Sequence, residues 1–539
     1  MSNIHVNQIG YRPLDKKVFV CKGIAEEFAI INKLNNEIVF KGKMDQPMYD
    51  EATGETVVQG DFTELTSSGE YYISVEGLGN SYCFAITDNV YENIKDGLLK
   101  ALYFQRCGME LEKEYADKWS HGICHKRDAI LYEAPDTKVE ISGGWHDAGD
   151  YGRYVVAAAK AVADLLLAYE FFPAAFNNKI NIPESGNNLP DILNEAKYEL
   201  EWLFKMQNKE TGGVYHKAAT QFFPGMIMPE EDAAPIVIYP ISSTATADFA
   251  AVMALASRLY EDKGKEFAER CLAASQKAWS WLVNNPEAKL FKNPPNMDSG
   301  EYGDKTDLDE RYWAAAELYR KTGRAEYHEY LKRVFSNLID TNSFGWSAVG
   351  GYGTVAYLFT ESSKVDARIY EVLRSRFIER ANIFVSISQK DGYKVASLPH
   401  KYSWGSNMGL LNNAMHLIIA NILEPEEAYV ETAIHQWNYI FGVNALSQCY
   451  VTGYGSKPIV HPHHRPSEGD GIVEPVPGLV SGGPCSGLLD AAAKKNCSGM
   501  PPAKCFIDNA ESYSTNEITI YWNSPAVFVA GFLNRDINI

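Results

Sequence analysis

The chain has 539 residues, of which 46% are hydrophobic and 22% are charged, as in folded proteins with a large core. Its formal net charge of −19 argues against nucleic acid and anionic membranes as partners, because both are negatively charged themselves. A neutral or cationic substrate is compatible with that charge. No apolar run reaches the length of a membrane-spanning helix, so we expect no membrane association.

The first residues, MSNIHVNQ, lack the basic start and apolar run of a signal peptide. We therefore expect a cytoplasmic protein, or a secreted one if a signal peptide has been removed. The cysteines point the same way, because an odd count of nine with irregular spacing fits a reducing compartment better than a disulfide framework. The sequence gives no indication of the oligomeric state.

Residues 1–88 alternate apolar and polar side chains in short runs separated by glycine, aspartate and asparagine. Such alternation predicts β-strands, and a spacing of roughly ten residues between strand centres favours an immunoglobulin-like β-sandwich. We expect this sandwich to form a domain of its own over 1–88. The predicted strands lie at 17–21, 28–31, 37–40, 70–75 and 82–86.

From about residue 91 the apolar residues recur at the three-to-four spacing of helices. We expect a mainly α-helical domain over 89–539, either an α-solenoid or a closed helical toroid. The toroid is favoured, because no fixed repeat period is visible. A long segment rich in Gly, Pro and His interrupts the helices at 450–525. The predicted helices include 93–106, 155–170, 191–206, 245–260, 267–282, 309–323, 366–380, 406–421 and 426–441.

The stretch GGWHDAGDYGRY at 143–154 places Asp147 and Asp150 three positions apart in a turn too rich in glycine to be a helix interior. Paired carboxylates suit a site where a water molecule is held and deprotonated, and the glycines let the backbone approach a ligand. A calcium-binding turn and a solvated acidic loop are the alternatives. The flanking aromatic residues, Trp145, Tyr151 and Tyr154, resemble the lining of a sugar cleft.

Two cysteines and two histidines form a possible metal set: Cys107, Cys124, His125 and His146. Structural zinc takes four such ligands in a tetrahedron. The spacing is not that of a zinc finger, so unrelated buried residues remain the alternative on spacing alone, and His121 is a competing ligand. Because His146 directly precedes Asp147, a metal bound there would fix the acidic turn.

The run HPHHRPS at 461–467 has three histidines and an arginine within five residues, stiffened by two prolines. Its side chains could bind metal, but hydrogen bonding to hydroxyls or to an active-site carboxylate is favoured by the arginine. The alternative is a solvated polar loop without a functional role.

In the segment 508–525, Glu517 is expected to open a largely apolar helix that runs toward the C-terminus, with Tyr513 and Asn516 beside it. A glutamate in that place is often only a first-turn acid that the helix dipole stabilises. Asp508 and Glu511 are rival acids in the same segment.

Taken together, five ordered motifs resemble glycoside hydrolase family nine, the inverting cellulases, and most closely its subgroup with an N-terminal immunoglobulin-like domain. The resemblance covers essentially the whole chain and implies an (α/α)6 barrel. The motifs are VNQIGYRP (6–13), GGWHDAGDYG (143–152), YVTGYGS (450–456), HPHHRPS (461–467) and TNEITIYWNSP (515–525).

The resemblance implies that Asp150 is the general base, that Asp147 helps to hold the nucleophilic water, and that Glu517 is the general acid. We expect roughly 6.5–9.5 Å between the carboxyl groups of Asp150 and Glu517, as inverting enzymes require. Glu517 should then have a raised pKa, whereas Asp150 should stay ionised.

Further roles also follow from the resemblance. Substrate contacts are implied for His463, Arg465 and Tyr513, and Cys107, Cys124, His125 and His146 are implied to bind structural zinc. Calcium is expected in the family too, but its ligands cannot be assigned here. Trp404 and Trp313 are candidates for stacking against sugar rings, although either could equally belong to the core.

The expected activity is therefore inverting hydrolysis of β-1,4-linked glucans, with soluble cello-oligosaccharides favoured as substrates and an endo mode of attack. The runner-up is an exo-acting β-glucosidase or exo-β-glucosaminidase on cello- or chitosan-oligosaccharides. Two other classes stay open: a non-catalytic sugar-binding protein that keeps the fold, and a hydrolase that uses a catalytic metal bound by its histidines.

Overall fold

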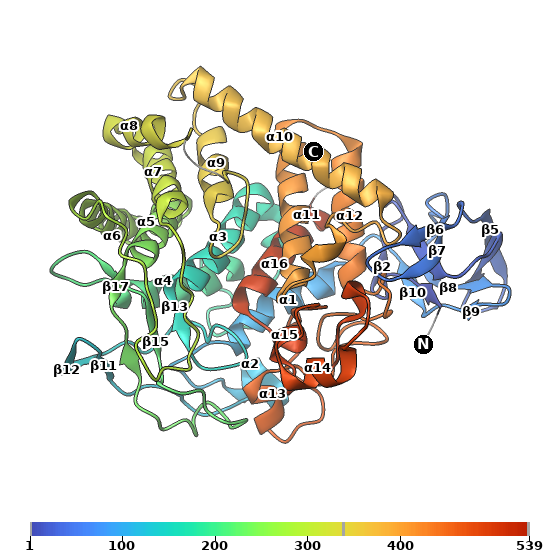
Figure 1. Ribbon diagram of the computed structural model, residues 1–539, viewed down its shortest axis with the longest axis horizontal. Coiled ribbons are helices and arrows are strands. Elements are labelled where there is room, and N and C mark those ends of the chain that lie inside the picture. The colour runs from blue at the N-terminus through green and yellow to red at the C-terminus, as the bar shows by residue number, and fades with distance from the viewer. Residues whose placement is uncertain (1–2, 337–339, 536–539) are drawn as a thin grey trace. The chain divides into compact units, whose positions relative to one another are not determined.

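The computed structural model describes residues 3–336 and 340–535 (Figure 1). The chain divides into two compact units. The first comprises residues 1–101 and 381–539, and the second comprises residues 102–380. Each unit is described by itself below. Within the described residues, no helix is long and apolar enough to cross a membrane, and all nine cysteines are free.

The N-terminal part of the first unit is a sandwich of two sheets, and all five predicted strands are present in it. One sheet has the order β1 (Ile4–His5), β3 (Val18–Lys22), β7 (Glu55–Asp61), β6 (Met48–Asp50). The other has the order β2 (Gly10–Tyr11), β10 (Phe84–Ile86), β8 (Gly69–Val75), β4 (Glu27–Asn32), β5 (Ile38–Lys43), with β9 (Gly79–Asn80) paired to β8.

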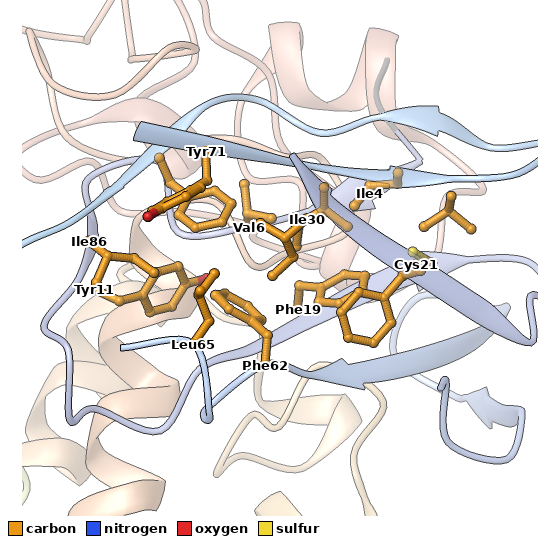
Figure 2. Packing of buried hydrophobic residues seen from close by; sticks show 14 of the residues in the cluster. Ile4, Val6, Tyr11, Phe19, Cys21, Ile30, Phe62, Leu65, Tyr71 and Ile86 are labelled. Atoms are coloured by element: carbon orange, nitrogen blue, oxygen red, sulfur yellow. The ribbon is translucent and has the colours of Figure 1, made fainter. Parts of the chain in front are cut away.

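Aromatic and branched side chains from both sheets fill the sandwich (Figure 2). The ring of Phe19 lies edge-on to Phe28 at 4.8 Å, and Tyr11 lies edge-on to Phe62 at 5.2 Å, an arrangement that aromatic pairs prefer. Gly60 is required beneath this cluster, because a Cβ there would lie 2.2 Å from the Phe19 ring. The alternation that predicted the strands thus reflects one buried face per sheet.

Helices form the rest of the first unit, and its longest ones match the predicted stretches. Helix α11 packs against both α12 and α16. The helices are most of α1 (Glu92–Phe104), the C-terminal part of α10 (Ala367–Lys390), α11 (Ser406–Leu423), α12 (Glu427–Ile440), α13 (Arg465–Gly469), α14 (Ala491–Cys497), α15 (Tyr513–Asn516) and α16 (Ile520–Leu533).

The sandwich is joined to these helices by a buried amide. Gln8 donates from Nε2 to the Ser447 carbonyl at 2.8 Å, and its Oε1 accepts from the backbone N–H groups of Ser456 and Lys457 at 2.9 and 2.8 Å. Asn7 donates in the same way to the Asn438 side chain at 2.8 Å. The first unit therefore unites the two ends of the chain.

The second unit is built around α5, which packs against α3, α6 and α7. Alanine-rich faces and glycines allow close contact; a Cβ on Gly353 would lie 2.6 Å from the Tyr312 ring, where α7 meets α9. Helices α8 and α9 are additions to the prediction. The helices are α2 (Lys113–Ala116), α3 (Val155–Phe171), α4 (Asp191–Met206), α5 (Ser243–Leu259), α6 (Lys265–Asn284), α7 (Leu308–Thr322), α8 (Ala325–Val334) and α9 (Gly350–Leu358).

Short strands that the sequence did not predict join the loops of the second unit into a five-stranded sheet. Its order is β12 (Ala134–Val139), β11 (Ala129–Leu131), β16 (Val237–Ile238), β15 (Lys217–Ala219), β13 (Arg153–Tyr154). A separate pair joins β14 (Val214–Tyr215) to β17 (Ile241–Ser242).

The predicted domain boundary at residue 88 lies between the last strand of the sandwich, β10, and helix α1. The division into domains 1–88 and 89–539 stays a prediction, because the compact units follow a different partition of the chain.

Candidate active site and metal centre

The acidic turn of residues 143–154 is held by backbone pairing with the segment that follows α1. The N–H of Cys107 donates to the Gly144 carbonyl, and the N–H of His146 donates to the Gln105 carbonyl, both at 2.7 Å. Gly144 has a φ of +74°, and a Cβ there would lie 2.7 Å from the Trp202 side chain. The glycine is thus required both by its left-handed backbone and by close packing.

Polar side chains packed against the turn form hydrogen bonds and ion pairs that hold it in place. Arg106 is fully buried and pairs with Glu195 at 2.7 Å and Glu184 at 2.9 Å. Glu195 also accepts from the indole N–H of Trp145 at 3.2 Å, and Glu199 accepts from the Trp145 backbone N–H at 2.5 Å.

Asp147 is almost completely buried, at 1% exposure. The hydroxyl of Tyr302 donates to its Oδ2 at 2.5 Å, whereas its Oδ1 has no hydrogen-bond partner among the described residues. Burial raises the pKa of Asp147 well above its ordinary value, and the charge of Asp150 adds to this, although the bond from Tyr302 opposes it. One oxygen is thus fixed by the protein and the other remains available as an acceptor.

Asp150 lies at the far end of the same turn and is 7% exposed. Its Oδ2 accepts from the N–H of Gly152 at 2.9 Å, and the Gly152 carbonyl accepts from the N–H of Asp147 at 2.9 Å. These two bonds join the Asp150 carboxylate and the Asp147 backbone to one glycine. With the burial of both aspartates, they exclude the alternative of a freely solvated acidic loop.

Tyr302 is the site residue that the sequence analysis missed. It belongs to the loop between α6 and α7 and has a φ of +49°, which is unusual for a residue with a Cβ. Its ring packs against Tyr154 at 4.6 Å and Trp346 at 4.8 Å. The available signal was the segment SGEYGD at 299–304, which shares the glycine, aromatic and acidic composition of the turn.

Cys107, Cys124, His125 and His146 lie together, all buried, with one ligand atom of each within 4.8 Å of the others. His146 Nε2 is 3.3 Å from His125 Nδ1 and 3.9 Å from the Cys124 sulfur. The other ring nitrogen of His125, Nε2, is 3.2 Å from the Asp232 carboxylate, as is usual behind a metal-bound histidine. This donor set fits a tetrahedral metal site.

Burial opposes ionisation of the Cys107 thiol, but the hydrogen bond with Cys124 and the charge of Arg153 together lower its pKa well below the ordinary value. A thiolate is the form that binds metal. His121, the competing ligand, lies outside the cluster and contacts the Gly122 carbonyl and Glu230 instead. No second group of three or more His, Cys, Asp or Glu side chains placed to hold a metal ion is found among the described residues.

Glu517 lies in the first unit and is 9% exposed. The expectation that it opens the last helix is wrong, because α16 begins at Ile520 and is capped by Thr519, whose side chain accepts from the Trp522 N–H. Glu517 instead follows α15 in extended conformation. Its carbonyl accepts from the N–H of Gly482 at 2.8 Å. Glu517 is therefore held by backbone pairing outside the helix and is not a first-turn acid that the dipole of α16 stabilises.

The HPHHRPS segment runs alongside Glu517, because His463 forms a parallel bridge with it. The N–H of His463 donates to the Asn516 carbonyl at 2.9 Å, and Nδ1 donates to the Ala510 carbonyl at 2.5 Å. The solvated-loop interpretation is therefore wrong for His463. Arg465 starts α13 and is buried, at 6% exposure.

The two rival acids of this segment, Asp508 and Glu511, do not lie where Glu517 lies. Asp508 accepts from the N–H groups of Val460 and His461 at 2.8 and 2.9 Å and from the Asn516 side chain at 2.9 Å, so it holds the histidine segment in place. Glu511 is exposed. Glu517 is the acid of this segment that lies beside His463.

The two tryptophans proposed to stack on sugars differ in exposure. Trp404 is 46% exposed, and its ring lies 5.4 Å from Tyr513, which in turn lies 6.2 Å from His463. Trp313 is completely buried on α7 and packs against Tyr352 at 5.0 Å. The stacking role expected for Trp313 is thus corrected, because a ring without accessible surface belongs to the core.

Comparisons with known proteins cover the whole chain. Residues 91–530 match the model of glycosyl hydrolase family 9, and residues 1–80 match the cellulase N-terminal ig-like domain. The chain belongs to glycosyl hydrolase family 9. This confirms the resemblance given by the motifs, and the chain is therefore a glycoside hydrolase of the cellulase type.

Three relatives of this family 9 chain cover it almost end to end. A cellodextrinase from Butyrivibrio fibrisolvens is 38% identical, with 98% of this chain and 99% of the relative aligned. A single-mutant thermostable endoglucanase from Alicyclobacillus acidocaldarius is 37% identical over 99% of this chain and 100% of its own, with a TM-score of 0.94. A Zn-binding triple mutant of a family 9 endoglucanase is 32% identical over 97% and 100%, with a TM-score of 0.93.

These matches confirm the expected fold class, an (α/α)6 barrel preceded by a small immunoglobulin-like domain. Inverting hydrolysis of β-1,4-glucans is likewise the chemistry of this family 9 enzyme. The separation of roughly 6.5–9.5 Å between Asp150 and Glu517 stays a prediction.

The bond from Tyr302 to Asp147 should contribute to catalysis. Replacing Tyr302 by Phe keeps the ring but removes a hydrogen bond to an acid, and such bonds contribute about 1.5–3 kcal/mol. We expect kcat on cellopentaose to fall by about 10- to 100-fold, and the melting temperature to fall as well, because the buried Asp147 loses its hydrogen-bond partner. Tyr132→Phe, on a partly exposed ring of the same unit, is the control. An unchanged kcat for Tyr302→Phe would show that the bond has no catalytic role.

Proposed function

We propose that the chain is an endo-acting, inverting β-1,4-glucanase whose preferred substrates are soluble cello-oligosaccharides. The observation that carries the preference is the end-to-end similarity to a cellodextrinase, 38% identical over 98% of this chain. The exposed Trp404 beside Tyr513 supports a surface that stacks on sugar rings. A β-linked oligosaccharide or polysaccharide is accordingly the expected partner.

In the proposed mechanism, Asp150 is the general base and Glu517 is the general acid. Asp150 takes a proton from water, whose oxygen attacks the anomeric carbon, while Glu517 protonates the leaving glycosidic oxygen. The sugar product is released with inverted configuration. Asp147 holds the water through Oδ1, the oxygen without a protein partner, because Tyr302 fixes Oδ2.

His463, Arg465 and Tyr513 are proposed to contact the substrate around Glu517. The bond from His463 Nδ1 to the Ala510 carbonyl sets the orientation of that ring, so that Nε2 is the acceptor of the neutral imidazole. Arg465 supplies a positive charge on the same segment. These contacts would fix the sugar whose glycosidic oxygen Glu517 protonates.

Zinc is the metal that we propose for Cys107, Cys124, His125 and His146. Two thiolates and two imidazoles leave no open position in a tetrahedral site, so the metal would supply structure. Its effect would be to fix His146, and with it the start of the acidic turn. A Zn-binding triple mutant of a family 9 endoglucanase supports this choice, whereas calcium remains an expectation without ligands.

Removing either catalytic carboxylate should abolish hydrolysis. We expect Asp150→Asn and Glu517→Gln each to lower kcat on cellopentaose by at least about 10³-fold, because each removes a proton transfer together with the charge that supports it. A leaving group that needs no protonation, such as fluoride, should restore activity to Glu517→Gln only. The exposed Glu511→Gln is the matched control and should keep full activity. Normal hydrolysis by Asp150→Asn or Glu517→Gln would refute the assignment.

The products should identify both the stereochemistry and the mode of attack. During hydrolysis of cellopentaose, proton NMR should detect the α-anomer first, because inversion of a β-linkage releases it. Chromatography should show cellobiose and cellotriose early in the reaction. Release of glucose alone, or faster turnover of chitosan oligomers, would favour the exo-acting alternative.

Metal removal should act on stability rather than on chemistry. Treatment with a strong chelator should lower the melting temperature by at least about 5 °C, since a ligand that binds only the folded state stabilises it. Metal analysis should find one zinc ion per chain in the native protein and none in Cys124→Ala. Cys271→Ala, which removes a buried thiol outside the cluster, should retain the zinc. Lost activity in folded, zinc-free enzyme would instead support a catalytic metal.

A further inference from the structure

Lys217 on β15 is a completely buried lysine whose ammonium is bound by one loop. Its Nζ donates to the Asn293 side chain and to the Gly300 carbonyl at 2.6 Å each, and to the Ser299 hydroxyl at 3.1 Å. The Ser299 carbonyl is a further acceptor at 3.3 Å. All these acceptors lie on the segment 293–300, directly before Tyr302.

The remaining surroundings of the ammonium are aromatic. Nζ lies 4.6 Å from the ring centroid of Tyr239, 5.4 Å from that of Phe291 and 5.6 Å from that of Tyr154, within the range of cation–π attraction. Burial lowers the pKa of Lys217 to about 7, although the charges of Asp150 and Glu301 oppose the shift. Burying an ionisable amine here is unfavourable by itself, and the hydrogen bonds to the loop offset part of that cost.

The preceding residue holds the same loop further along. His216 Nε2 lies 3.1 Å from the Glu301 carbonyl, and its ring stacks on Phe291 at 4.1 Å. Glu301 also closes the loop on itself, because its carboxylate accepts from the Asn293 N–H at 2.9 Å. Residues 216 and 217 therefore fix both ends of the segment 293–301.

The backbone of Lys217 is tied to the acidic turn. Strand β15 pairs with β13, which forms the last two residues of the turn, and Lys217 lies opposite Tyr154. The backbone of one residue is thus joined to the strand after Asp147 and Asp150, while its side chain holds the loop that carries Tyr302. Tyr302 itself has an unfavourable positive φ, so its conformation depends on the contacts around it.

We propose that Lys217 is a positioning residue for the hydrolytic reaction: it holds the 293–301 segment so that the Tyr302 hydroxyl stays on Asp147. The proposal rests on the water-holding role proposed above for Asp147. Lys217 does not contact the reacting atoms, and its effect reaches them through Tyr302. The role predicts that Lys217 and Tyr302 contribute to one and the same interaction.

A double-mutant cycle tests this dependence. Lys217→Met should lower kcat on cellopentaose by about 10- to 100-fold with less than about a threefold change in KM, as Tyr302→Phe does. The double variant should be no slower than the slower single variant, because residues that act as a unit are not additive. Two effects on kcat that multiply would overturn the proposal, and so would an unchanged kcat for Lys217→Met.

Lys160→Met is the matched control, since Lys160 is equally buried but pairs with Asp164 on α3. Its effects should be confined to stability and independent of Tyr302→Phe. Should Lys217→Met fail to fold, Asn293→Leu removes one acceptor of the ammonium and should show the same non-additivity. If Asp147→Asn and Tyr302→Phe both leave kcat unchanged, the role of Asp147 fails and the proposal falls with it. If they lower kcat but the cycle is additive, only the role of Lys217 fails.

Discussion

The structure of the second unit depends on the pairing between residues 105–107 and 144–146. Its two backbone hydrogen bonds bring Cys107 and His146 side by side, and from that contact both the metal cluster and the position of Asp147 follow. The charge of Arg106 lies in the middle of the pairing, fully buried and bound to Glu195 and Glu184. Loss of one partner would leave an uncompensated charge in the interior, which is among the costliest defects in a protein.

This arrangement places several carboxyl groups in the buried interior. Burial raises the pKa values of Asp147, Glu195 and Glu199, all within or beneath the same turn. A region designed only for stability would avoid such groups. Their presence together marks the turn as a functional region independently of any motif, and the left-handed glycines beside it give the backbone the conformation that the turn requires.

Residues with a strong local pattern were predicted well from the sequence. The helix at 191–206 agrees with α4 at both ends, because its apolar spacing is regular and the residues around it do not continue a helix. Gly323, the last residue of the predicted helix 309–323, ends α7 in a left-handed conformation, which glycine adopts readily. The four side chains proposed as metal ligands also lie together, although their spacing in the sequence alone could not distinguish them from unrelated core residues.

The prediction failed where position depends on tertiary contacts. Strands β13, β15 and β16 have two or three residues each, too few for a periodicity to appear. Tyr302 reaches Asp147 from 155 positions away, through a loop whose path is set by Lys217 and His216. The sequence did not distinguish Trp313 from Trp404 as a possible sugar-stacking residue. Only the complete burial of Trp313 on α7 assigns it to the core.

The Gln8 side chain has a consequence for how the chain can be divided. Its amide satisfies a carbonyl and two N–H groups of the segment 447–457, which would lose these partners if the sandwich were removed. Cutting the chain after the sandwich would expose these groups, together with the surface around Asn438. The sandwich therefore shields part of the surface of the C-terminal helices from solvent. A barrel produced without the sandwich would expose that surface and would tend to associate through it, whereas a barrel that had been joined to its neighbour only by a linker would not.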